Sequence, residues 1–192
     1  MTTATRRSIV AIALFMAVPP GASGAQEPAT RGHDWWADHV AFISRDGGVW
    51  ETPNPAAASD PTAPDAFGLA WRAVDNGQGL VGRLYGVEAG RETVGFWTFR
   101  AFRHPGKGVV VLEQWGPGGM YGVGEITSPE AGRTVVEQTF WLPDGRSWRE
   151  GHRAQDSGDR HETEVFDIGA DGVWTAKAEN VWRRAAAHAA SG

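Results

Sequence analysis

A turn signal recurs about every 13 residues between Asp75 and Gly172, and this rhythm constrains the fold more than any other feature of the chain. Most of the signals combine glycine with asparagine, aspartate, proline or serine, the residues that populate tight turns. The segments between the signals are short and mostly alternate apolar with polar residues, as strands do when one face is buried. Because short turns join strands that pair with each other, the rhythm predicts an antiparallel up-and-down meander.

The expected elements form one all-β domain. Strands of about ten residues span about 30 Å, which favours a β-barrel of about 8 to 10 strands over a short-stranded sandwich. A short amphipathic helix at 33–44 is expected to plug one barrel end, and a first strand begins near Gly47 before a long loop at 52–65. The further strands are expected at 67–74, 78–87, 92–103, 109–115, 120–127, 133–142, 146–155, 160–168 and 173–184.

Ten tryptophans and 26 glycines stand out in this chain of 192 residues. Tryptophan side chains are large and rigid enough to form the wall of a core or cavity. Glycine permits the backbone conformations that the turns and bends of a strongly curved sheet require. The absence of cysteine excludes disulfides, thiol catalysis and thiolate metal sites. The composition therefore suits a closed barrel held together by its apolar core.

Residues 1–25 are typical of a secretory signal peptide that is cleaved. A cationic start precedes an apolar run at 8–18 that is too short to span a bilayer, and small residues with two prolines follow. The segment around Arg6 and Arg7 also resembles a twin-arginine export signal. We therefore expect a periplasmic or secreted protein, exported by the Sec or the twin-arginine route. The expected mature chain has a flexible leader at 26–32, the barrel domain at 33–184 and a disordered or frayed tail at 185–192.

The charge balance argues against nucleic acid and anionic lipid as partners. Cleavage of the signal peptide would remove Arg6 and Arg7 but no acidic residue. The mature chain would then have 16 basic residues in place of 18, against 23 acidic ones. This acidic excess repels phosphate groups. The expected partner is a small apolar molecule, with no nucleic acid and no membrane span.

Two hairpins are expected to gather polar residues on one face of the strand at 146–155. A three-residue loop at 143–145 sets Gln138 opposite Glu150, and a two-residue turn at 157–158 sets His152 opposite Thr163. Because every second residue of a strand points the same way, one face then carries Gln138, Glu150, His152 and His161.

Three interpretations of this cluster stay open. The side chains form a structural hydrogen-bonded set, or they orient a ligand, or Glu150 and His152 act as an acid/base pair inside a cavity. If the face points inward, the tryptophans expected at the cavity wall are Trp71, Trp97, Trp148 and Trp182. The last strand alternates in the same manner, with one face formed by Trp174, Ala176, Ala178, Asn180 and Trp182.

We expect no metal and no cofactor. His33 and His39 are too far apart for adjacent turns of one helix, and His161 and Glu162 point to opposite faces of a strand. Neither pair has the spacing of metal ligands.

The strand from Glu92 to Arg103 is apolar on both faces. One face carries Val94, Phe96 and Phe102, and the other carries Trp97 and Phe99. An apolar outer face is expected to be covered, either by a helix or loop of the same chain or by a second copy in a homodimer.

Gly48, Val49 and Trp50 near the first strand, with Arg183 or Arg184 at the end of the last, resemble the lipocalin-like arrangement of the calycin superfamily, as found in bacterial exported proteins of unknown function. The resemblance implies an apolar cavity open at one end, with Trp50 and Arg183 as structural residues that close the base. The chain is also similar to haem-binding nitrobindin-like barrels. Its last strand contains Asn180 and no histidine, however, so we do not expect this protein to bind haem as those barrels do.

The leading functional hypothesis is an exported lipocalin-like barrel that binds a small, largely apolar ligand in its cavity. The rival hypothesis is an enzyme, a lyase, isomerase or hydrolase, that uses Glu150 and His152 as an acid/base pair. The third is an envelope protein-interaction module that uses an exposed apolar strand face.

Overall fold

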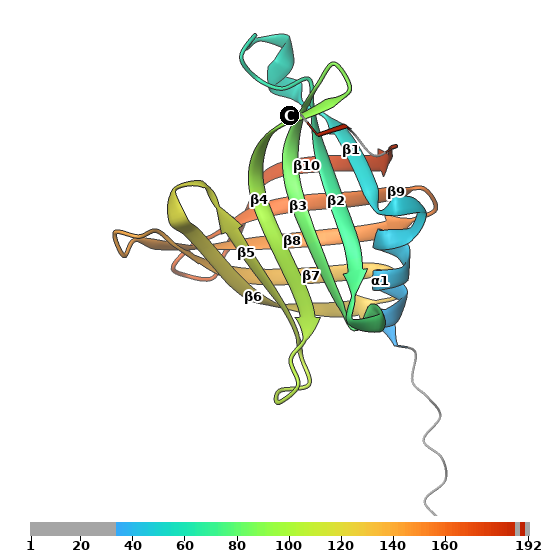
Figure 1. Ribbon diagram of the computed structural model, residues 1–192. Helices are drawn as coiled ribbons and strands as arrows, with labels where there is room; N and C mark the ends of the chain where they lie inside the picture. The colour runs from blue at the N-terminus through green and yellow to red at the C-terminus, as the bar shows by residue number, and fades with distance from the viewer. Residues whose placement is uncertain (1–33, 187–188, 191–192) are drawn as a thin grey trace, which may run out of the picture. The chain divides into compact units, whose positions relative to one another are not determined.

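A computed structural model describes residues 34–186 and 189–190 (Figure 1). Ten antiparallel strands form one sheet in which each strand pairs with its neighbours in the sequence. The first strand also pairs with the tenth, through Trp50 with Arg184 and Glu51 with Arg183, and this contact closes the sheet into a barrel. The predicted all-β, up-and-down meander barrel is therefore confirmed.

The observed strands lie close to the positions expected from the turn signals. They are β1 (Val49–Pro53), β2 (Ala66–Val74), β3 (Gly79–Glu88), β4 (Arg91–Arg103), β5 (Val110–Gly116), β6 (Met120–Glu130), β7 (Arg133–Trp141), β8 (Ser147–Ser157), β9 (Arg160–Ile168) and β10 (Trp174–Arg184). Short 3-10 turns occupy Arg45–Gly47, Pro55–Ala58, Asp75–Gly77 and Pro117–Gly119. A two-residue strand, β11 (Ala189–Ala190), runs parallel to the start of β4.

The expected signal peptide at 1–25 and leader at 26–32 lie outside the described residues. Among the residues that are described, no helix combines the length and the apolar character needed to cross a membrane.

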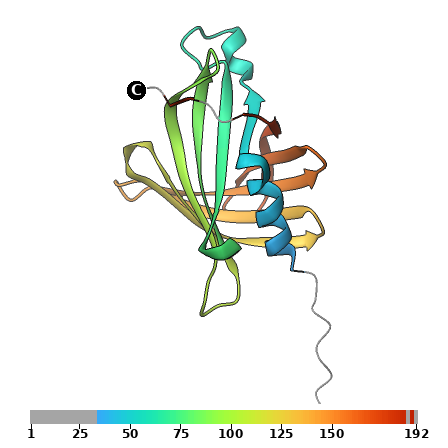
Figure 2. The same cartoon turned by 45° about the vertical axis from the view of Figure 1, so that its right-hand side comes forward.

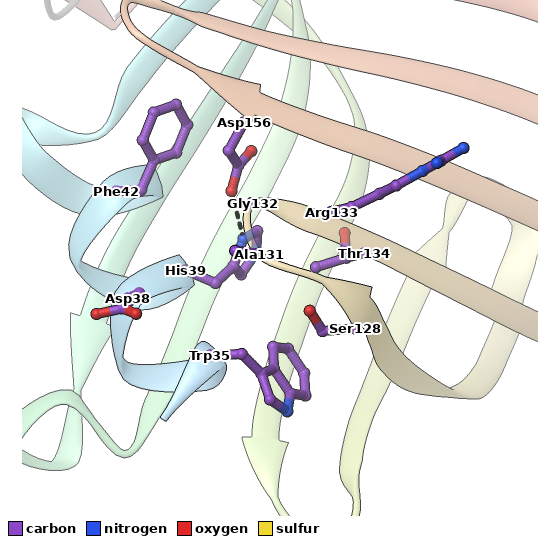
Figure 3. Close-up of a pocket in the computed structure, with 10 residues that line it drawn as sticks. All are labelled: Trp35, Asp38, His39, Phe42, Ser128, Ala131, Gly132, Arg133, Thr134 and Asp156. Carbon is purple, nitrogen blue, oxygen red and sulfur yellow. Dashed lines mark hydrogen bonds and ion pairs between the residues drawn. The ribbon is translucent and has the colours of Figure 1, made fainter. Parts of the chain in front are cut away.

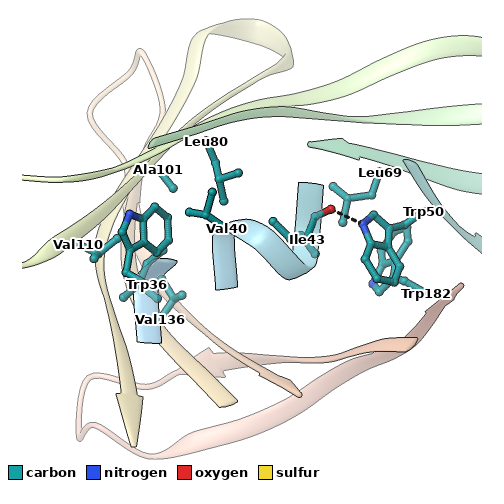
Figure 4. Packing of buried hydrophobic residues seen from close by; sticks show 11 residues of the cluster. Trp36, Val40, Ile43, Trp50, Leu69, Leu80, Ala101, Val110, Val136 and Trp182 are labelled. Atoms are coloured by element: carbon teal, nitrogen blue, oxygen red, sulfur yellow. Dashed lines mark hydrogen bonds between the residues drawn. The ribbon is translucent and has the colours of Figure 1, made fainter. Parts of the chain in front are cut away.

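Helix α1 (Trp35–Ser44) fills one end of the barrel, as its amphipathic pattern predicts. It begins at Asp34, whose carboxylate accepts a hydrogen bond from the Ala37 amide at 3.3 Å. Trp36, Val40 and Ile43 lie on one helical face and are buried. In Figure 2 the helix lies between β1–β3 and β7–β9. Figure 4 shows its apolar face packed among side chains that the barrel strands contribute, including Leu69, Leu80, Val136 and Trp182.

Trp50 and the end of β10 close this side of the barrel. Trp50 is fully buried and donates a hydrogen bond from Nε1 to the carbonyl of Ile43 at 2.9 Å. The guanidinium of Arg184 lies 3.7 Å from the centre of the Trp50 ring, and it also donates to the carbonyl of Phe42. Arg183, assigned from the resemblance as the residue over Trp50, instead points outward with 62% of its side chain exposed. Strand alternation explains the correction, because the buried Trp182 puts residue 184 on the inner face.

A β-bulge in β10 overturns part of the predicted alternation. The register with β9 shifts between Ala176 and Ala178, which leaves Lys177 as an extra residue. Trp174 consequently lies on the outer face, 5.4 Å from Phe166 between ring centres, and it covers Gly151. Ala176 shares that outer face, opposite Phe166. Only the part of β10 beyond the bulge follows the predicted inner pattern.

β4 contains a similar irregularity. The register with β3 shifts next to Phe96, which packs edge-on against Phe67, a side chain that packs against the main apolar core. The expected outer apolar face of the strand from Glu92 to Arg103 is thereby reduced to an exposed Val94 and to Phe102, which lies under the guanidinium of Arg100. The predicted homodimer through this face stays a prediction.

Candidate functional site

A cavity of about 240 Å³ lies inside the barrel, between α1 and the inner faces of the strands. Most of its wall is apolar and includes Trp71, Phe99 and Val136. The polar side chains at the wall are His39, Gln114, Thr134, Gln138, His152, His161, Thr163 and Asn180. The cavity therefore combines low-dielectric walls with a small set of hydrogen-bonding groups, the usual make-up of a small-molecule site.

Gln138 is the most unusual of these groups. The predicted hairpin register between β7 and β8 is confirmed, with Gln138 opposite Glu150 and Val136 opposite His152. Gln138 is only 1% exposed, yet neither its Nε2 nor its Oε1 has a hydrogen-bond partner among the described residues. A buried polar group that lacks a partner costs about 1–3 kcal/mol of stability. Because the accessible surface of both amide atoms is close to zero, the amide is an unpaired polar group held within the barrel wall.

Glu150 is held in an ion-paired group beside His152, a residue of the cavity wall. Its carboxylate lies 3.0 Å from Lys177 Nζ and 3.1 Å from His152 Nε2, and Lys177 also contacts Asp167 at 3.1 Å. Burial alone raises the pKa of the Glu150 carboxyl, but the neighbouring His152 and Lys177 outweigh it and hold the pKa below its usual value. Glu150 is therefore an ionised, weakly basic carboxylate and does not itself line the cavity.

The second hairpin differs from the prediction by two residues. Ser157 pairs with Arg160, so His152 lies opposite Val165 and not opposite Thr163. A shift of two residues preserves which side chains share a face, and His161 stays on the inner face with Gln138 and His152. The same shift sets His161 directly opposite Asp156, a residue that the sequence reasoning did not single out.

Asp156 joins two histidines from distant parts of the chain. His39 Nδ1 on α1 donates to Asp156 Oδ2 at 2.8 Å, and His161 Nδ1 on β9 donates to Asp156 Oδ1 at 2.7 Å. Burial by itself raises the pKa of the Asp156 carboxyl, but the hydrogen bonds from His161 and His39 lower it from its ordinary value of 3.8 to about 2. The strand pattern could have indicated Asp156, because it alternates with Glu150 and His152. No sequence signal connects it with His39.

A second pocket, of about 340 Å³, lies between α1 and the hairpin of β6 and β7 (Figure 3). Trp35, Phe42 and Arg133 are among its lining residues. His39 and Thr134 line both this pocket and the central cavity, so the contact between His39 and Asp156 stands between the two spaces.

The four tryptophans expected at the cavity wall divide into two pairs. Trp71 and Trp182 line the cavity, where Trp71 stacks on Phe99 with ring centres 5.2 Å apart. Trp97 and Trp148 lie outside the lining and pack on either side of Phe140, at 5.6 and 5.1 Å between ring centres. The structure therefore places Trp71 and Trp182 at the cavity wall, and Trp97 and Trp148 against Phe140 instead.

Over the described parts of the chain, no group of three or more His, Asp, Glu or Cys side chains has a metal-binding arrangement. The geometry supports binding of a small molecule among mostly apolar walls. Comparison of the chain with protein-family models, with curated proteins and with solved structures gave no match.

Proposed function

We propose that this protein is an exported, lipocalin-like barrel that binds a small, largely apolar molecule in its central cavity. Export is inferred from the signal-like residues 1–25. The likeness to lipocalins is inferred from the closed meander barrel and from Arg184, at the end of β10, which packs on Trp50. The observation that carries the proposal is the mostly apolar cavity of about 240 Å³ inside the barrel, whose wall also contains a small set of polar side chains.

The volume of the cavity limits the size of the ligand. An engineered apolar cavity of about 150 Å³ accommodates benzene. At about 240 Å³, the cavity in this barrel suits a molecule of roughly ten non-hydrogen atoms. Apolar surface on such a ligand would gain about 25 cal/mol for each Å² removed from water.

The state of Glu150 supports binding over acid–base catalysis. A general acid or base works best when its pKa lies near the working pH, and such groups are tuned toward neutrality by burial. The pKa of Glu150 is lowered instead, and its oxygens contact Lys177 and His152. The enzyme hypothesis with Glu150 and His152 as an acid/base pair therefore loses its main support.

Native mass spectrometry of the protein purified from its own host tests the proposal. A bound small molecule of a mass that fits the cavity is expected on the wild-type protein. Ala154→Phe, which extends a larger side chain from the cavity wall, is expected to remove it while the circular dichroism of the sheet is unchanged. A molecule retained equally by the wild type and a folded Ala154→Phe variant would place binding elsewhere and contradict the proposal.

A further inference from the structure

Three aromatic side chains form a row on the outer face of the barrel. Trp115 on β5 pairs across the sheet with Tyr121 on β6, and Tyr121 pairs with Trp141 on β7. The ring centres of Trp115 and Tyr121 are 5.6 Å apart, and those of Tyr121 and Trp141 are 6.1 Å apart. Trp115 is 43% exposed and Trp141 is 39% exposed. Contiguous apolar surface of this kind marks an interaction site.

The aromatic row continues beyond Trp115 into a pocket of about 360 Å³. Thr98 on β4 lies opposite Trp115, and Arg83 on β3 lies opposite Thr98. All three residues line the pocket. A ligand that covers the aromatic rings can therefore extend into a space that has polar side chains of its own.

Hydrogen-bonding side chains flank the aromatic row on the same face of the sheet. Glu113, two residues before Trp115, accepts a hydrogen bond from the Tyr121 hydroxyl at 3.1 Å. Burial and this contact raise the pKa of Tyr121, so the hydroxyl stays a donor to the carboxylate. Arg100 and Thr139 lie in the same cross-strand row as Glu113. Because a carboxylate has about four acceptor sites, Glu113 can also accept from a ligand.

The charged side chains around the row do not favour a charged polymer. Basic and acidic residues lie beside each other, as Arg83 with Glu92, Arg149 with Glu137, and Arg100 with Glu113. Among the described residues of this face there is consequently no excess of basic side chains, which a polyanion such as nucleic acid requires. The charge pattern fits a neutral partner.

We propose that this outer face is a second binding site, separate from the central cavity, for a neutral glycan built of hexopyranose rings. The C–H face of such a sugar stacks on an aromatic ring, and its hydroxyls both donate and accept hydrogen bonds. Successive aromatic rings are spaced by about the length of one sugar, so an extended chain places one sugar over each of them. A proline-rich peptide also binds aromatic surfaces, but proline has no N–H to donate to Glu113.

Calorimetric titration of the purified protein with cellohexaose, a neutral chain of β-1,4-linked glucose, tests the proposal. We expect a dissociation constant below about 1 mM. Added salt should change it little, because a neutral ligand forms no ion pairs with the protein. Glucose alone should bind at least about tenfold more weakly, because it covers one aromatic ring and leaves the others in water. Decaproline should bind more weakly than cellohexaose.

Two variants assign the binding to the aromatic row. Trp115→Ala and Trp141→Ala each remove one exposed ring, so each is expected to weaken cellohexaose binding at least about fivefold while the circular dichroism of the sheet is unchanged. Trp174→Ala is the matched control. Trp174 lies on the outer face of β10, where it packs on Phe166 and stands outside the row. This variant is expected to bind cellohexaose as the wild type does.

Several results would overturn the proposal. They are a folded wild type that does not bind cellohexaose, binding that both row variants retain, and an equal loss in Trp174→Ala. Tighter binding of decaproline would assign the face to a proline-rich peptide instead. A wild-type dimer that either row substitution dissociates would make the row an interface between copies of this chain. None of these results bears on the central cavity, because the row lies on the opposite face of the sheet from Gln114, which lines that cavity.

Discussion

Gln138 owes its place at the cavity wall to a turn rather than to its own neighbours. Proline, aspartate and glycine at 143–145 set the register of β7 and β8, and this register put Gln138 opposite Glu150 as predicted. Which face points inward, and that the amide lacks partners, could not be predicted. The lack of partners depends on Gly124 across the sheet and on Lys177, which forms an ion pair with Glu150.

Replacing Gln138 by leucine is expected to stabilise the ligand-free protein. The change removes an unpaired buried amide and keeps the volume of the side chain, so the free energy of unfolding should rise by about 1 kcal/mol. Urea denaturation measured without added ligand checks this value. A loss of stability of similar size would mean that the amide has partners in the native protein.

Asp156 makes stability depend on acid pH in a defined range. Its pKa falls from 3.8 in an ordinary setting to about 2 in the folded protein, so its contribution is fully present above about pH 4 and is lost as the pH falls toward 2. Asp156→Asn should therefore reduce the free energy of unfolding by about 2 kcal/mol at pH 7.

The pH dependence of that difference is the diagnostic result. Urea denaturation of the wild type and Asp156→Asn should give stabilities that converge between about pH 4 and pH 2. A difference that stays constant down to pH 2 would indicate a loss of packing and not of the charged contacts with His39 and His161.

At the scale of elements, alternation predicted most strands but failed where a strand contains an extra residue. In β10 the sequence shows regular alternation from Trp174 to Trp182, and the bulge at Lys177 divides it. The bulge is fixed by contacts far away in the sequence, since Lys177 reaches Glu150 while Trp174 covers Gly151. A pattern read along a single strand contains neither contact.

Deletion of Lys177 tests the bulge directly. Without the extra residue Ala176 and Ala178 become neighbours opposite Phe166 and Val165, so both halves of β10 keep their faces, and a loss of less than about 1 kcal/mol in unfolding free energy is expected. Lys177→Ala keeps the bulge and removes the same half-exposed ion pairs, so it should lose a similar amount. Thermal denaturation of the two variants measures both losses, and a loss of at least about 3 kcal/mol on deletion alone would contradict the assignment of Lys177 as the extra residue.

At the scale of the whole molecule, the meander was predictable because its turns are local, whereas its closure was indicated only indirectly, by strand length, composition and the resemblance. The contact between β1 and β10 pairs two residues on each strand and joins parts of the chain more than 100 positions apart. Arg184 over Trp50 and the hydrogen bond from the Ala185 amide to the Val49 carbonyl, at 3.0 Å, reinforce this short contact.

The central claim is that the closed barrel contains a mostly apolar cavity able to hold a small molecule. Crystals of the ligand-free protein exposed to xenon under pressure test it most directly, because dry apolar cavities take up xenon whereas polar, hydrated ones do not. The account predicts xenon inside the barrel, among Trp71, Phe99 and Val136. Ordered water throughout that space, with xenon bound only outside the barrel or not at all, would contradict it.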